Sequence, residues 1–180
     1  MSGKPSGIEP WRIVESTWIL RSAFMDIRRD RCRKVDGPRT RDYLALDLKD
    51  FSVVVALTPA REVLLCREYK HGARGLMYTL PAGFIEPGET PEQGARRELL
   101  EETGHAAAAF TPLGTFLLVP DLAAARGHVF LARDARAETT PHPDEDEEIE
   151  VETVPLDRAT GHLEDASSLL AFQLARPHLL

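Results

Sequence analysis

Cysteine is scarce in this chain. Only two cysteines, Cys32 and Cys66, occur among its 180 residues. Secreted domains that depend on disulfides carry many more, so a disulfide framework is not expected. Cys66 falls within an apolar, strand-like run, and we interpret both thiols as reduced packing residues rather than a disulfide or a metal-binding pair.

An excess of positive charge and long apolar runs are also missing. Lys and Arg number 22 against 29 Asp and Glu, which gives a formal net charge of -7, and no basic stripe is visible. Binding to long nucleic acid or to an anionic membrane is therefore not expected. The apolar run at residues 51–57 is far too short to span a bilayer, and the N-terminus lacks the apolar core of a signal peptide. A cytoplasmic protein is the simplest interpretation.

Hydrophobic residues, by contrast, make up 43% of the chain, which is enough for one domain with a sizeable core. β-Branched and aromatic runs predict many strands and few helices. The predicted strands cover residues 11–24, 25–33, 43–47, 51–57, 63–69, 77–80, 106–110, 113–119, 128–132 and 149–155. The predicted helices cover residues 91–103, 156–163 and 166–175. Because strands do not alternate regularly with helices, this order indicates an α+β fold.

The segment 83–104 is unusually rich in glutamate. It places four carboxylates close together, those of Glu89, Glu98, Glu101 and Glu102. Carboxylates at such spacing repel one another unless a positive charge lies among them. The segment is therefore a candidate site for hard cations, which points to phosphate chemistry. A solvated acidic helix is the simpler alternative.

Local signals predict where the helix within this segment begins and ends. Thr90 is a good N-cap, Pro91 suits the first helical position, and Gln93 completes a capping box. Gly104 is a natural C-terminal stop. At about 100° per residue, three glutamates fall on one side of this helix: Glu98, Glu101 and Glu102. Arg97 can pair with Glu101 one turn later, or with Glu89.

The spacing of these residues resembles the Nudix box. That pattern is Gly, five residues, Glu, seven residues, Arg-Glu, an aliphatic residue, any residue, Glu-Glu, any residue, Gly and an aliphatic residue. The matching positions are Gly83, Glu89, Arg97, Glu98, Leu99, Glu101, Glu102 and Gly104. The chain departs from the pattern only at the last position, which is His105. Because that position packs rather than binds, the departure affects local packing and not the expected metal site.

The resemblance implies an α+β fold, the Nudix α/β/α sandwich. It also implies a smaller N-terminal β-sheet region at residues 1–48, used for dimerisation and for the substrate pocket, ahead of a hydrolase domain at residues 49–180. The family's N-terminal regions often exchange across a homodimer, so a homodimer is expected.

A second resemblance concerns the substrate. Pro120 follows Gly104 by sixteen residues, which is similar to the ADP-ribose pyrophosphatase group. Residues 67–72, 80–89 and 11–18 also resemble that group. The implied reaction is hydrolysis of ADP-ribose, a small-molecule nucleotide sugar, to AMP and ribose 5-phosphate. An alternative for Pro120 is that it simply ends a strand.

The resemblance also implies roles for individual residues. The metal ligands would be the carboxylates of Glu98, Glu101 and Glu102 with the backbone carbonyl of Ala82, and they would hold two or three Mg²⁺ or Mn²⁺ ions. Glu102 and Arg97 count among the catalytic residues. Arg97 and Glu89 would hold the helix and its loop in register, and Gly83 and Gly104 would be structural.

The catalytic base and the substrate contacts lie outside the box. By resemblance the base belongs to a late acidic loop, here residues 144–148, with Glu145 as first candidate and Glu147 as second. The candidate substrate-binding residues are Arg67, Trp11, Tyr43 and Pro120. Arg67 is equally consistent with a surface ion pair, and the two aromatic residues with packing.

Three other functions are open. One is hydrolysis of GDP-mannose, a UDP-sugar or a broad range of nucleoside diphosphate compounds. Another is a non-catalytic sensor that binds ADP-ribose, although such proteins usually lose box glutamates and this chain keeps them. The third is a plain acidic metal-binding module, which does not explain Gly83, Arg97 and Gly104 at their spacings.

Overall fold

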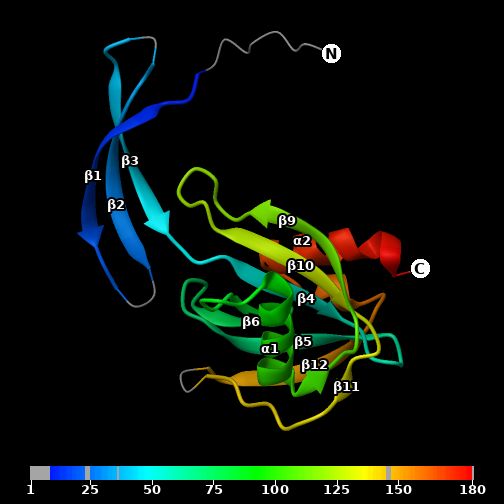
Figure 1. Ribbon diagram of the computed structural model, residues 1–180. Coiled ribbons are helices and arrows are strands. Elements are labelled where there is room, and N and C mark those ends of the chain that lie inside the picture. Colours follow the sequence, from blue (N-terminus) through cyan, green and yellow to red (C-terminus); the bar gives the residue numbers. More distant parts are fainter. Residues whose placement is uncertain (1–8, 23–24, 36, 145–146, 180) are drawn as a thin grey trace, which may run out of the picture. The chain divides into compact units, whose positions relative to one another are not determined.

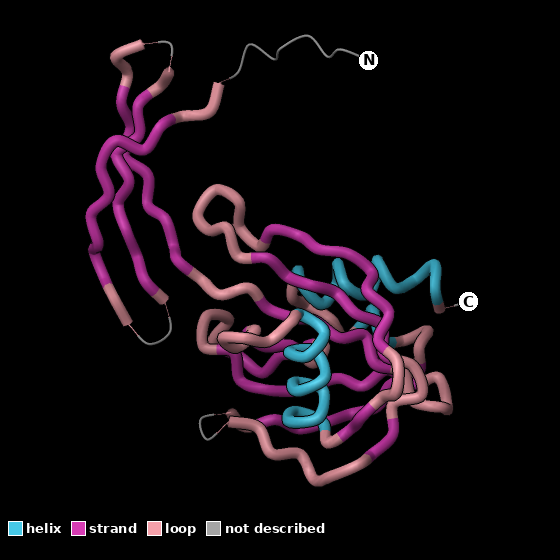
Figure 2. The backbone as a smooth tube through the Cα atoms, viewed as in Figure 1, coloured by secondary structure: helices cyan, strands magenta, loops and turns pink. Residues whose placement is uncertain are grey.

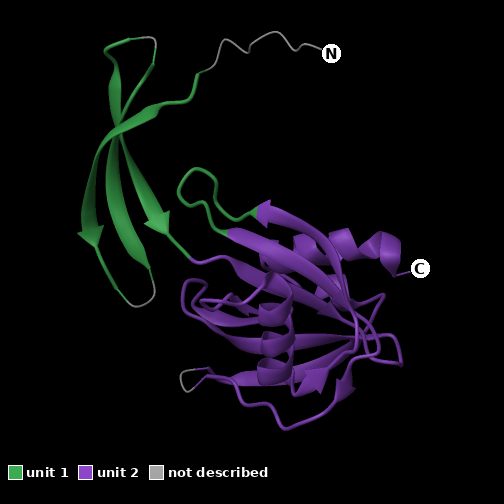
Figure 3. Ribbon diagram, viewed as in Figure 1, with its two compact units in different colours: residues 1–48, 117–125 green, residues 49–116, 126–180 purple. Residues whose placement is uncertain are grey.

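The computed structural model describes residues 9–22, 25–35, 37–144 and 147–179. The chain forms two compact units, one of residues 1–48 with 117–125 and one of residues 49–116 with 126–180 (Figure 3). The second segment of the first unit, 117–125, includes Pro120 and comes from a distant part of the sequence.

The first unit is built on an antiparallel sheet in the order β1-β2-β3 (Figure 1). Its strands are β1 (Arg12–Leu20), β2 (Asp26–Arg33) and β3 (Thr40–Asp47). The segment 117–125 joins this sheet, because Leu46 N–H donates to the carbonyl of Leu122 at 2.7 Å and Leu46 bridges Ala123. Every residue of β1 is exposed, so β1 is an open edge strand.

The second unit contains two larger sheets, shown as magenta strands in Figure 2. One has the order β7-β4-β10-β9, with β4 (Phe51–Ala56), β7 (Ala82–Phe84), β9 (Phe110–Leu117) and β10 (Arg126–Ala132). The other has the order β12-β5-β6, with β5 (Glu62–Lys70), β6 (Gly75–Thr79) and β12 (Ile149–Pro155). A small pair is formed by β8 (His105–Ala106) and β11 (Arg136–Ala137).

Two helices cover opposite faces of these sheets, α1 (Pro91–Thr103) and α2 (Ala166–Ala175) (Figure 1). Strand β4 lies between the two helices, and its fully buried valines point alternately into two hydrophobic cores. Val54 packs in the cluster that contains Leu99 of α1, while Val53 packs in the cluster that contains Phe172 of α2. Strands with apolar residues on both sides belong between two layers. The predicted α+β class is confirmed.

Most predicted elements are present, and helices α1 and α2 have the predicted ends. The prediction of a helix at residues 156–163 is wrong, because only a 3₁₀ turn, η1 (Ala159–Gly161), forms there. Its amide groups bond three residues back, as Gly161 N–H does to Arg158 O at 3.0 Å. A second turn, η2 (Arg176–His178), follows α2.

The strand predicted at residues 106–110 is also interrupted. Strand β8 ends at Ala106 and β9 begins at Phe110, so the alanines between them form no strand. The short strands β7 and β11 were not predicted. Within the described residues no helix is long and apolar enough to cross a membrane. Both cysteines are buried free thiols, as predicted.

Candidate active site

Helix α1 is held at both ends by the contacts that the sequence predicts. Thr90 Oγ1 accepts from the Gln93 amide at 3.3 Å, and Gln93 Oε1 accepts from the Thr90 amide at 2.8 Å. At the other end Gly104 takes the left-handed conformation, with φ 68°, and donates to Leu100 O. The capping box and the glycine stop are confirmed, and they set the position of every glutamate on this helix.

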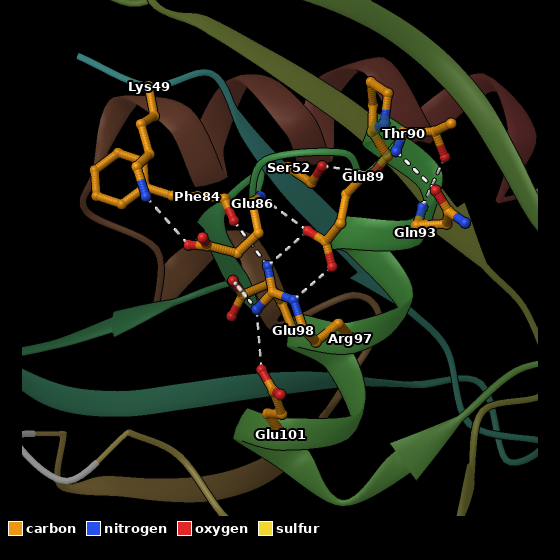
Figure 4. Close-up of polar contacts among 11 residues, drawn as sticks. Lys49, Ser52, Phe84, Glu86, Glu89, Thr90, Gln93, Arg97, Glu98 and Glu101 are labelled. Carbon is orange, nitrogen blue, oxygen red and sulfur yellow. Dashed lines mark hydrogen bonds and ion pairs between the residues drawn. The ribbon is translucent and has the colours of Figure 1, made fainter. Parts of the chain in front are cut away.

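Arg97 is the centre of a polar network that joins α1 to the loop before it (Figure 4). Its guanidinium donates to Glu89 Oε1 at 2.9 Å and to Phe84 O at 2.8 Å, both in that loop or the strand leading to it. It also donates to Glu98 Oε1 at 2.7 Å and Glu101 Oε2 at 3.0 Å on the helix. The bond between Arg97 and Glu89 is the largest cause that raises the pKa of Arg97 and lowers that of Glu89.

Gly83 lies directly against the carboxylate of Glu98. A Cβ atom at position 83 would collide with the Glu98 side chain, so no other residue fits without displacing it. The Glu98 side chain is 12% exposed, and burial is the largest cause that raises its pKa to about 7, against the opposing effect of Arg97.

Glu102 is the most buried of the box glutamates, with 4% exposure. Its Oε2 accepts from the amide of Ala82 at 3.0 Å and lies 3.6 Å from the Cys66 sulfur. Burial, followed by the charge of Glu98, raises the pKa of Glu102 well above its usual range. A buried carboxylate with this environment is favoured as an anion only when a cation joins it.

The donor set of the helix fits a hard divalent cation, because carboxylate oxygens are the ligands that Mg²⁺ and Mn²⁺ prefer. In the described part of the chain, however, no three His, Cys, Asp or Glu side chains already form a metal-binding group. Glu98 and Glu101 are engaged by Arg97, and Glu102 by Ala82. Each of these bonds engages one carboxylate oxygen, Glu98 Oε1, Glu101 Oε2 and Glu102 Oε2, so the second oxygen of each group is the donor that a metal ion would use.

Residues 138–142, which lead into the late acidic loop, are attached to the C-terminal end of α1. The amides of Glu138 and Thr139 donate to Gly104 O at 2.8 and 3.1 Å, and the His142 amide donates to Glu101 O at 2.8 Å. This explains a second requirement for Gly104, since a Cβ there would collide with the carbonyl of Thr139. The chain is thus held on the helix that carries the glutamates two residues before the predicted base loop begins.

Of the two candidates for the catalytic base, the structure describes Glu147 but not Glu145. Glu145 lies outside the described residues. Glu147 lies at the surface. Its pKa is raised, first because the surrounding protein removes some of the water from its carboxylate, and then by the charges of Glu68 and Asp144. Its charge in turn raises the pKa values of Glu98 and Glu102, which places Glu147 within electrostatic reach of the helix carboxylates.

Of the predicted substrate-binding residues, Arg67 belongs to the same unit as the carboxylates but does not face them. Arg67 pairs with Glu150 at 2.6 Å, and it lies on the face of β5 opposite to that of Cys66, which touches Glu102. Trp11 and Tyr43 lie in the first unit and contact each other edge to face, with ring centroids 6.1 Å apart. Pro120 belongs to the same unit.

Cys66, Glu68 and Lys70 of β5 were missed as site residues. Cys66 had been interpreted only as a packing residue, yet its sulfur lies against Glu102. Glu68 is buried with 7% exposure in a strand that is otherwise apolar on its buried positions. The sequence could have indicated Glu68, because a charged residue at a buried position of an apolar strand is rare unless it has a partner.

A family model described as NUDIX domain matches residues 48–172. The chain therefore belongs to the Nudix family, and it is a Nudix hydrolase with the α+β sandwich that the resemblance implied.

Two sequence relatives and one solved structure are consistent with this assignment. The chain is 35% identical over 126 residues to the ADP-ribose pyrophosphatase of Bacillus subtilis (strain 168), covering 67% of this chain and 68% of the relative. It is 29% identical over 126 residues to the methanol dehydrogenase activator of Bacillus methanolicus, with the same two coverages. A solved structure described as an ADP compounds hydrolase has the same fold, with a TM-score of 0.84, 22% identity, and coverage of 97% of this chain and 96% of that one.

Proposed function

We propose that this Nudix hydrolase cleaves the pyrophosphate bond of ADP-ribose to give AMP and ribose 5-phosphate, in a reaction that depends on Mg²⁺. The observation that carries the chemistry is the position of two carboxylates on one side of α1, Glu98 half-buried against Gly83 and Glu102 buried against Ala82. Burial raises the pKa of both, which supports a cation as their missing partner. The similarity to the Bacillus subtilis ADP-ribose pyrophosphatase supports the substrate.

The proposed metal ligands are the carboxylates of Glu98, Glu101 and Glu102 and the backbone carbonyl of Ala82. Two or three Mg²⁺ or Mn²⁺ ions bound there would neutralise the charge of the phosphoanhydride and make an attacking water more acidic. Arg97 would position the ligands. Its bonds to Glu89 and Phe84 hold the helix against the loop, and its positive charge stabilises the carboxylates of Glu98 and Glu101.

Proton transfer is the task we assign to the late acidic loop. A carboxylate of Glu145 or Glu147 accepts a proton from the water as its oxygen attacks phosphorus and the bond to the bridging oxygen breaks. Two features support Glu147: its raised pKa, and the attachment of the preceding residues 138–142 to Gly104 and Glu101. A base with a raised pKa is better matched to neutral pH than an ordinary glutamate.

Substrate binding and assembly are assigned to the N-terminal region. We propose that residues 1–48 serve dimerisation and the substrate pocket, with Trp11, Tyr43 and Pro120 as contacts and Arg67 as a further candidate. The open edge of β1 supports pairing between two copies in a homodimer. The two free buried thiols support a reducing, cytoplasmic location.

Other substrates remain as alternatives to ADP-ribose. They are GDP-mannose, UDP-sugars or a broad range of nucleoside diphosphate compounds, and a panel of these with Mg²⁺ and product analysis separates them. A non-catalytic ADP-ribose sensor is a weaker alternative, because all the box glutamates are present.

The variant Glu102→Gln tests the proposed metal site. Glutamine keeps the hydrogen bond from Ala82 but cannot supply the anionic ligand, so kcat for ADP-ribose should fall by about 100-fold or more while the melting temperature is maintained. Glu92→Gln is the matched control, because within the described part of the chain Glu92 pairs with Arg96 alone, on the same helix. Its kcat should stay within about twofold. Near-normal turnover by Glu102→Gln would disprove the metal assignment.

A further inference from the structure

Glu102 is held by a different set of groups from the other two helix glutamates, which accept from the guanidinium of Arg97. Its carboxylate accepts two hydrogen bonds on the same oxygen, Oε2. One comes from the Ala82 amide at 3.0 Å, and the other from the Cys66 thiol, whose sulfur lies 3.6 Å from that oxygen. The orientation of this buried carboxylate therefore depends on one amide and one thiol.

Cys66 lies on the face of β5 that is turned toward helix α1. It has no solvent exposure. Leu64 shares this face, because it is the alternate residue of the strand, and it packs in the cluster that contains Leu99 of α1. A free thiol is protonated at neutral pH and is a weak donor. Since no water reaches it, the proton of Cys66 is directed at the carboxylate of Glu102.

We propose that Cys66 is a positioning residue for Glu102. Its thiol and the Ala82 amide together hold Oε2 against the strands, which leaves Oε1 as the oxygen that a divalent cation binds. The inference rests on the proposed function in taking Glu102 as a metal ligand.

Two donors achieve what one donor does not. A single hydrogen bond fixes the place of Oε2 but lets the carboxylate turn about it, whereas two bonds from different directions also fix the plane of the group. Here the amide belongs to β7 and the thiol to β5, which lie in different sheets. Partners of this kind orient metal ligands and affect metal affinity without touching the ion.

The first test is the affinity of the substrate-free protein for Mn²⁺. Cys66→Ala removes the thiol donor and introduces no polar group. The Kd for Mn²⁺, measured from the electron paramagnetic resonance signal of the free ion, should rise by about two- to tenfold, as expected for the loss of one weak hydrogen bond. The Mg²⁺ concentration for half-maximal activity should rise likewise, while kcat at saturating Mg²⁺ stays within about twofold.

Leu64→Val is the matched control. It removes apolar volume from the same face of the same strand, at a residue that packs among apolar side chains. Both variants should lower the melting temperature, because each leaves a gap in the core. Only Cys66→Ala should weaken Mn²⁺ binding. If Cys66 has a packing role alone, the two variants will leave the Kd for Mn²⁺ equally unchanged.

The second test observes the hydrogen bond itself. The chain has only two cysteines, so its infrared spectrum has two S–H stretching bands, and the band absent from Cys66→Ala belongs to Cys66. Glu102→Gln should change the frequency of this band. The band of Cys32 should stay in place, because that sulfur belongs to the other unit and faces the carbonyl of Asp30 at 3.9 Å.

An unchanged Kd for Mn²⁺ in Cys66→Ala overturns the proposal, and so does a Cys66 band that is the same in Glu102→Gln. If Cys66→Ala does not fold, Cys32→Ala assigns the bands instead, and the effect of Glu102→Gln decides. If wild-type protein neither binds Mn²⁺ nor hydrolyses ADP-ribose, the proposed function fails, whereas the infrared comparison still decides whether Cys66 holds Glu102.

Discussion

Gly83 shows how a missing side chain shapes the site at the scale of one residue. A Cβ at this position would collide with the carboxylate of Glu98, so the absence of a side chain leaves the space that this carboxylate occupies. The pattern of the Nudix box marks the glycine in the sequence, but the reason for it lies in a contact between a strand and a helix fifteen residues later.

Gly83→Ala should therefore displace Glu98. Overpacking of this kind costs about 1–3 kcal/mol in the free energy of unfolding. The Mg²⁺ concentration needed for half-maximal activity should also rise, by about tenfold or more, if Glu98 is a ligand. Calorimetry and Mg²⁺ titrations of activity measure the two effects.

Gly72→Ala is the control for this change, because a Cβ at position 72 has no atom within 4 Å. It should leave both quantities unchanged. An unaltered Mg²⁺ requirement in Gly83→Ala would show that Glu98 is not a ligand or that the strand can move to accommodate the methyl group.

At the scale of elements, helix α1 was predictable because its signals are local. Thr90, Gln93 and Gly104 act on amide and carbonyl groups within four residues of themselves, so the ends of the helix follow from the sequence. The segment 156–163, which was wrongly predicted as a helix, has no comparable capping residues, and only turns with bonds between residues i and i+3 form there. The attachment of the late loop to Gly104 and Glu101 was not predictable, because it joins segments more than thirty residues apart.

The two ends of α1 should contribute unequally to stability. Thr90→Ala removes the N-cap acceptor and should cost about 1 kcal/mol in the free energy of unfolding. Gly104→Ala should cost more, because its φ of 68° disfavours side chains by about 1–2 kcal/mol and the methyl group would also meet Thr139 O. Urea unfolding measures both.

Gly161→Ala serves as the comparison for Gly104→Ala, since a Cβ at position 161 meets no atom within 4 Å. Its cost should be close to zero. A smaller loss for Gly104→Ala than for Thr90→Ala would contradict the dual role of Gly104.

At the scale of the whole molecule, stability should depend on pH through Glu98 and Glu102. Without metal the folded protein holds protons on these groups more tightly than the unfolded chain, in which glutamate titrates near pH 4.3. Their stabilising contribution is complete below that pH. It is lost as pH rises through about 7 for Glu98, and through the raised pKa of Glu102.

Metal should reverse this loss. Mg²⁺ competes with protons for these carboxylates, so its effect on the melting temperature should be larger at pH 8 than at pH 6. Calorimetry with and without Mg²⁺ at both pH values tests this expectation, and Glu102→Gln should reduce the difference. An equal gain at the two pH values would argue against these ligands.

Assembly is the second expectation for the whole molecule. The edge strand β1 exposes several large apolar residues, including Ile13, Trp18 and Ile19, which is unusual for a strand left in water. Light scattering should give about 40 kDa, twice the 20.0 kDa of one chain. Ile19→Asp should weaken the dimer, whereas Leu170→Asp, at an exposed leucine of α2, should not. A monomer at micromolar concentration would contradict the proposed homodimer.

The family, the ends of the glutamate-rich helix α1 and the class of reaction follow from the amino-acid sequence alone. Caps, spacing and charge act over a few residues, and the Nudix box is continuous in the chain. The tertiary structure decided which glutamates are buried, and it brought Ala82 and Cys66 to Glu102 and the late loop to the end of α1. It also placed Arg67 on the far face of β5. These relations depend on strand register and on packing between distant segments, which no local pattern encodes.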